Sequence, residues 1–234
     1  MADSLYLSLW YPNLRLEALP DKLTAVLGAF AAHGGEAKVY AATVWPIGWN
    51  EAPVFQRVWG RVAGQAQGGG GQRGIDPRQA VEEALELLHD DYAYEFQIGW
   101  SLWEVETPEG TTADPSTRQL RDLARGDKDQ SMLDARWVRE PRLVRVTGFG
   151  PLFDGGAYEQ EGHIKVDFGP DTPFLEEGVD LDNVGAKHVE ENVRQLVELT
   201  GAIEKGSGAT ARLLWSELGE SLAQRLAARL GVGN

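Results

Sequence analysis

Residues 92–102 are the segment that most constrains the fold. Large apolar side chains occupy every second position, while small or polar residues fill the positions between them: Tyr92, Tyr94, Phe96, Ile98, Trp100 and Leu102 against Ala93, Glu95, Gln97, Gly99 and Ser101. A period of two indicates a β-strand with one buried face. This is the clearest strand in the chain, and the fold must therefore contain a β-sheet.

The elements before this strand follow a recognisable order. Alternation or β-rich composition predicts strands, and apolar residues at helical spacing predict helices: strands at 4–10, 36–45 and 54–60, and helices beginning near Pro20 and Pro77. Asp76 is the expected N-cap of the second helix. Strand–helix–strand–strand–helix–strand over residues 4–105 is the order of a ferredoxin-like fold. We therefore predict an α+β protein whose N-terminal half, residues 1–105, is ferredoxin-like.

The rest of the chain has a different pattern. Residues 106–135 are polar and rich in Pro, Gly, Thr and Asp, which is typical of a linker or excursion. Residues 136–234 predict two strands and two helices: strands at 137–149 and 162–168, and helices at about 186–204 and about 210–230. Because two strands are too few for a sheet of their own, we expect this half to extend the first sheet or to cover its open face.

Charge and composition exclude several classes of protein. The chain has no cysteine, and its 36 acidic and 22 basic side chains give a formal charge of −14. This balance disfavours nucleic acid as a partner. The basic series Arg136, Arg139, Arg142 and Arg145 is more typical of a solvated strand edge or of internal salt bridges. The N-terminus lacks signal-peptide features and no apolar run is long enough for a membrane span, so we expect a soluble cytoplasmic protein with no membrane partner.

Motifs of known chemistry are mostly missing. The sequence has no phosphate-binding loop, no HExxH and no GxSxG. Residues 180–191 resemble a calcium loop in part, but Val184 and Lys187 break the pattern. His89, Asp90 and Asp91 are typical of a helix end and a turn. The segments 162–175 and 213–230 resemble bacterial sequences and imply no activity. We expect no cofactor, except for a possible divalent metal.

Aromatic residues point to a binding surface. Tyr6 and Trp10 lie opposite the apolar face of the first strand, and Trp103 lies opposite Trp100. Aromatic-lined hollows are typical of ligand sites, although packing against the second half would also account for these residues. We predict a non-enzymatic protein that binds a small molecule or a basic protein partner through an aromatic cleft with an acidic rim. The residues assigned to it are Tyr6, Trp10, Trp45, Trp49, Glu95 and Trp103.

Two alternatives remain open. A metal-assisted hydrolase would use His163, Asp167 and His188 as ligands and Glu161 as general base, provided that these side chains converge. A structural oligomer would bury the tryptophan-rich face at a subunit interface. Both leave the fold prediction unchanged.

Overall fold

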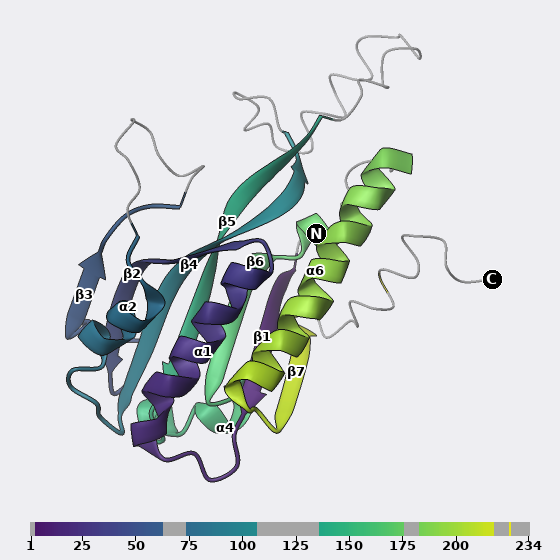
Figure 1. The fold of residues 1–234 in the computed structure, drawn as a ribbon. Coiled ribbons are helices and arrows are strands. Elements are labelled where there is room, and N and C mark those ends of the chain that lie inside the picture. Colours follow the sequence, from purple (N-terminus) through teal and green to yellow (C-terminus); the bar gives the residue numbers. More distant parts are fainter. Residues whose placement is uncertain (1–2, 63–73, 107–135, 176–182, 218–224, 226–234) are drawn as a thin grey trace, which may run out of the picture.

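The computed structural model describes residues 3–62, 74–106, 136–175, 183–217 and 225. These residues build a seven-stranded sheet in the order β3-β2-β4-β5-β6-β1-β7 (Figure 1). Its strands, in chain order, are β1 (Ser4–Trp10), β2 (Gly35–Pro46), β3 (Phe55–Val58), β4 (Tyr92–Val105), β5 (Trp137–Phe149), β6 (Ile164–Pro170) and β7 (Ala211–Ser216).

Every neighbouring pair of strands is antiparallel. Strands two or four places apart in the sheet therefore run in the same direction. Three helical connections join such strands: β1 to β2, β3 to β4, and β6 to β7. In each case at least one other strand lies between the two that are joined. The sheet is thus a set of interleaved split β-α-β units.

The three longer helices lie on one face of the sheet (Figure 1). They are α1 (Leu19–Ala32), α2 (Pro77–Ala84) and α6 (Asn183–Ser207), and α1 contacts both of the others. Four short helical segments complete the described structure: η1 (Leu16–Ala18), η2 (Phe153–Gly155), α4 (Tyr158–Glu161) and α5 (Thr172–Leu175). The opposite face of the sheet carries none of the three longer helices.

The core lies between this sheet and the helices. Apart from the partly buried Tyr92, the apolar side chains predicted for β1 and β4 are almost completely buried in it, including Leu5, Leu7, Leu9, Phe96, Ile98 and Trp100. Trp100 contacts Phe30 of α1 and donates a hydrogen bond from Nε1 to the His33 carbonyl oxygen at 2.7 Å. The alternation in the sequence therefore identified the buried faces of both strands.

The order of elements over residues 4–105 is the predicted one, but a ferredoxin-like arrangement is not confirmed. β1 pairs with β6 and β7, whereas β2, β3 and β4 pair among themselves and with β5. The strands of the second half extend the sheet. This was one of the two arrangements expected for this half, the other being a cover over the open face of the first sheet. The excursion predicted at 106–135 lies almost entirely outside the described residues.

The helix predicted at about 210–230 is wrong over its first residues. Ala211–Ser216 form β7, an edge strand paired with β1. Gly208, at φ +71°, lies just after α6, and the Thr210 amide donates to the Trp10 carbonyl oxygen. This reversal brings the segment to the free edge of β1. Hydrogen bonding to the backbone groups of that edge favours a strand more strongly than the leucine spacing of four residues favours a helix. Residues 218–224 and 226–234 lie outside the described part.

Asp76 is the N-cap of α2, as the sequence predicted. Asp76 Oδ1 accepts hydrogen bonds from the amides of Arg78 (2.9 Å) and Gln79 (3.4 Å). We expect Asp76→Ala to lower the free energy of unfolding by about 1 kcal/mol, because these amides lose their acceptor. Chemical denaturation measures the loss. Asp76→Ser, which keeps a capping oxygen, is the control, and an equal loss in both variants would contradict the capping role.

Candidate functional site

A groove of about 300 Å³ lies on the sheet face opposite α1. Its aromatic walls are Tyr6, Trp49 and Phe149, and its charged residues come from β4, β5, β6 and the end of α4: Glu95, Arg145, Glu161, Lys165 and Asp167. We call this hollow the sheet-face groove. Tyr6, Trp49 and Glu95 were predicted from the sequence as binding residues, and Asp167 as a metal ligand.

The alternation of side chains along the paired strands β4, β5 and β6 places the charged groove residues of these strands on one face of the sheet. Register places Arg145 beside both Gln97 of β4 and Asp167 of β6. Gly162, at φ +89°, allows the chain before β6 to approach β1 closely, since a Cβ there would lie 2.7 Å from the Leu9 nitrogen. This junction carries Glu161 on one side of Gly162 and His163 on the other.

Both cations of the groove already have anionic partners. Arg145 Nη1 lies 3.3 Å from Asp167 Oδ2, and Lys165 Nζ lies 2.6 Å from Glu161 Oε2. The Lys165 ammonium also lies 4.6 Å from the centre of the Tyr6 ring, within cation–π range. The positive charges of the groove are therefore largely satisfied within the protein.

Glu95 differs from the other carboxylates of the groove. It forms no ion pair within 4 Å among the described residues, and burial raises the pKa of its carboxyl group above the ordinary value. The Arg145 charge and a hydrogen bond from Gln97 oppose this rise without cancelling it. Glu95 is thus a half-buried acid whose negative charge is incompletely compensated.

Trp49 is one of the three aromatic walls of the sheet-face groove. Its side chain is 39% exposed, and its ring makes edge-to-face contacts with Phe153 at 5.1 Å and with Trp45 at 6.0 Å. Such contacts hold the indole in place from behind, while its exposed part remains available. Trp45 supports this wall without lining the groove.

Tyr6 borders the groove on the β1 side. Its ring stacks on Trp215 with centroids 4.7 Å apart, and its hydroxyl donates to Glu217 Oε1 at 2.7 Å. Burial is the main cause that raises the Tyr6 pKa to about 12, so the phenol stays protonated at neutral pH. This stacking supplies a second rigid aromatic surface.

The other predicted aromatic residues lie elsewhere. Trp10 Nε1 donates to the Glu159 carbonyl oxygen at 3.4 Å. Trp103 stacks on His188 of α6 at 4.1 Å, and its backbone bonds to Asn192. Trp103 therefore packs against the second half of the chain, away from the groove.

The three predicted metal ligands do not come together. His188 lies between Trp103 and Trp137, near the first residue of β5. His163 lies near the other end of β5, where Gly148 pairs with Ile164. Asp167 follows His163 by four residues of extended chain, or about 13 Å. No group of three or more His, Asp or Glu able to hold a metal occurs within the described ranges.

The hydrogen bond of His163 also disfavours metal binding. The Tyr11 amide donates to His163 Nδ1 at 3.2 Å, so the neutral ring carries its proton on Nε2. A metal-binding histidine ordinarily has the reverse arrangement, with its other ring nitrogen donating a hydrogen bond. His163 therefore has no free lone pair in its neutral form.

The arginine series forms ion pairs, which was one of the two interpretations offered for it besides nucleic-acid binding. The four partners are carboxylates on neighbouring elements: Arg136 with Glu106, Arg139 with Glu191, Arg142 with Glu104 and Arg145 with Asp167. In the segment that resembles a calcium loop in part, Asp180 and Asp182 lie outside the described residues. His89 is exposed and lies 4.0 Å from Asp91 in a turn.

The groove also contains three polar residues that were not predicted as binding residues from the sequence: Arg145, Thr147 and Lys165. The signal was present, because each lies on the polar face of a predicted strand. What the sequence lacked was the register that places β5 and β6 beside Glu95.

Comparisons with models of protein families, with curated proteins and with solved structures find no match. Among the helices of the described residues, none has the length and apolar character needed to cross a bilayer.

Proposed function

We propose that this is a non-enzymatic binding protein whose sheet-face groove accepts a cationic group, either of a small molecule or of a basic protein partner. Glu95 supplies the opposing charge, and Trp49 and Tyr6 supply aromatic contact. The observation that carries the proposal is the half-buried Glu95 without an ion-pair partner within 4 Å among the described residues.

The charges of the groove favour a cation over an anion. An anion would have to displace Asp167 from Arg145 or Glu161 from Lys165, and would lie near Glu95. A guanidinium or ammonium group would instead compensate Glu95 and pack against Trp49. The overall charge of −14 would also speed the encounter with a basic partner.

The experiment uses N-acetyl-argininamide as the probe and its uncharged analogue N-acetyl-glutaminamide as the matched ligand. Calorimetry at low salt is expected to show binding of the arginine probe alone. Glu95→Gln should weaken that binding about 10- to 100-fold, because a charge-assisted hydrogen bond is lost.

The matched control variant is Glu190→Gln, which removes one exposed carboxylate on α6. It should leave the affinity of the arginine probe unchanged. Equal affinity of both probes, or equal weakening by the two variants, would sink the proposal.

A further inference from the structure

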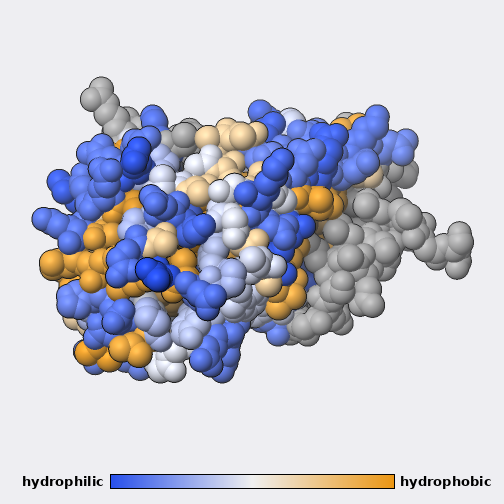
Figure 2. All heavy atoms as spheres, turned by 60° about the horizontal axis from the view of Figure 1, so that its bottom comes forward, coloured by the Kyte–Doolittle hydropathy of each residue, from blue (hydrophilic) through white to orange (hydrophobic). Residues whose placement is uncertain are grey.

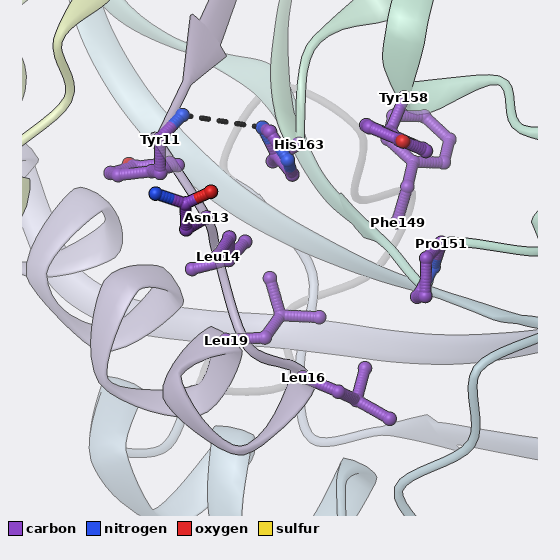
Figure 3. Close-up of a pocket in the computed structure, with 9 residues that line it drawn as sticks. All are labelled: Tyr11, Asn13, Leu14, Leu16, Leu19, Phe149, Pro151, Tyr158 and His163. Atoms are coloured by element: carbon purple, nitrogen blue, oxygen red, sulfur yellow. Dashed lines mark hydrogen bonds between the residues drawn. The ribbon is translucent and has the colours of Figure 1, made fainter.

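A second hollow, of about 330 Å³, lies at the end of the sheet near α4. Figure 2 brings this end of the molecule forward and shows hydrophobic patches within a mainly hydrophilic surface. The hollow lies between the β1–α1 connection and the β5–β6 connection (Figure 3). We call it the His163 pocket. Among the described residues, Phe149 alone lines both this pocket and the sheet-face groove.

The walls of the His163 pocket combine apolar side chains with four residues that carry polar groups: Tyr11, Asn13, Tyr158 and His163. Leu14, Leu16 and Leu19 line one side, and Phe149 and Pro151 line the other (Figure 3). Leu19 and Phe149 are almost completely buried, so they form a fixed base. No lysine, arginine or carboxylate belongs to the described lining. The pocket therefore suits an uncharged molecule with both apolar and hydrogen-bonding groups.

His163 provides one directed polar group in these walls. Its ring stacks on Tyr158 with centroids 4.8 Å apart and meets the Tyr11 ring edge-on at 6.1 Å. The hydrogen bond from the Tyr11 amide to Nδ1 places the proton on Nε2, on the side of the ring away from Tyr11 (Figure 3). Within the described part of the chain, Nε2–H has no hydrogen-bond acceptor.

The imidazole stays neutral at physiological pH. Burial lowers the His163 pKa from its ordinary value, and no carboxylate belongs to the described lining to oppose this. A neutral ring with a fixed tautomer is a hydrogen-bond donor at Nε2 and not a base. The pocket thus combines apolar side chains with the fixed Nε2–H donor of His163, and Asn13 and Tyr158 also line it.

From this geometry we infer that the His163 pocket binds a small uncharged carbonyl compound, whose oxygen accepts a hydrogen bond from His163 Nε2–H while its hydrocarbon part contacts Leu14, Leu16 and Phe149. A carboxylate is disfavoured because no cation belongs to the described lining. The volume suits a ligand at the small end of the usual range for such sites, about 300–1,000 Å³.

The test compares two molecules of nearly the same shape. Acetophenone carries a carbonyl group where α-methylstyrene carries a methylene group. Binding is followed by the ¹⁵N and ¹H signals of the His163 ring in protein labelled at histidine. We expect acetophenone to bind about three- to tenfold more tightly, as one neutral hydrogen bond predicts. We also expect only acetophenone to shift the Nε2–H proton signal downfield.

Two variants test whether the ligand occupies the His163 pocket. Leu16→Trp fills the pocket from a partly exposed position and leaves the His163 hydrogen bond in place, so it should abolish binding. Glu190→Gln should leave acetophenone binding unchanged, because Glu190 is an exposed residue of α6 that does not belong to the described lining. Equal affinity of the two molecules, binding that survives Leu16→Trp, or preference for a carboxylate such as benzoate would each overturn the inference. None of these outcomes depends on the arginine-probe result.

Discussion

Asn192→Ala is expected to lower the free energy of unfolding by about 2–4 kcal/mol, since several buried polar groups lose their partner together. The Asn192 side chain is completely buried in α6. It accepts from the Trp103 amide at 2.9 Å and donates to the carbonyl oxygens of Trp103 and Pro173, both at 2.8 Å. One side chain thus connects α6 to β4 and to α5.

Chemical denaturation of the purified variant measures this loss, with Asn50→Ala in an exposed turn as the control. The control should remain within about 0.5 kcal/mol of the parent protein. If Asn192→Ala costs less than about 1 kcal/mol with an unchanged denaturant slope, the three backbone groups have found other partners and the connecting role is wrong.

Glu95→Gln is expected to stabilise the protein at pH 7 while it weakens cation binding. Burial raises the pKa of the folded carboxyl group above its ordinary value of 4.5. Between these two pKa values the folded state holds more protons than the unfolded state, so stability falls as pH rises. Once the pH exceeds the folded-state pKa, the ionised Glu95 therefore lowers stability by a cost that glutamine does not have.

Thermal melts between about pH 4 and pH 8 test this sign. The midpoint of Glu95→Gln should exceed that of the parent protein at pH 7, and the difference should shrink as pH falls toward the ordinary pKa of 4.5. Glu190→Gln should show no such trend. A less stable Glu95→Gln at pH 7 would mean that attraction to Arg145 exceeds the cost of burial. The arginine probe should raise the midpoint of the parent protein and not that of Glu95→Gln.

Local patterns in the sequence predicted most elements because their causes are local. The period of two in β4 identified its buried face, and Asp76 with Pro77 marked the start of α2. The sheet order depends instead on pairings between distant segments, such as β1 with β6 and β7. Residues 211–216 show the same limit, since their own spacing indicates a helix and a neighbouring edge makes them a strand.

The candidate site was predictable to the extent that it follows strand faces. Glu95 and Tyr6 were found because alternation places them opposite buried neighbours. Trp103 satisfies the same rule, yet it lies near the far end of the long β4–β5 pair, where it meets His188 of α6. No spacing within β4 reveals that a helix more than eighty residues later contacts this end of the strand.

The interleaved strands have a consequence for how the chain folds during synthesis. Among the strands that the structure describes, β1 is synthesised first, but both of its neighbours, β6 and β7, are made after residue 163. Until then both backbone edges of β1 lack their final partners, and its three leucines cannot be buried in the complete sheet. We expect slow, late assembly, because such distant contacts carry a large loop-closure cost. A nascent chain in this condition is exposed to aggregation, which gives chaperones their longest opportunity to bind it.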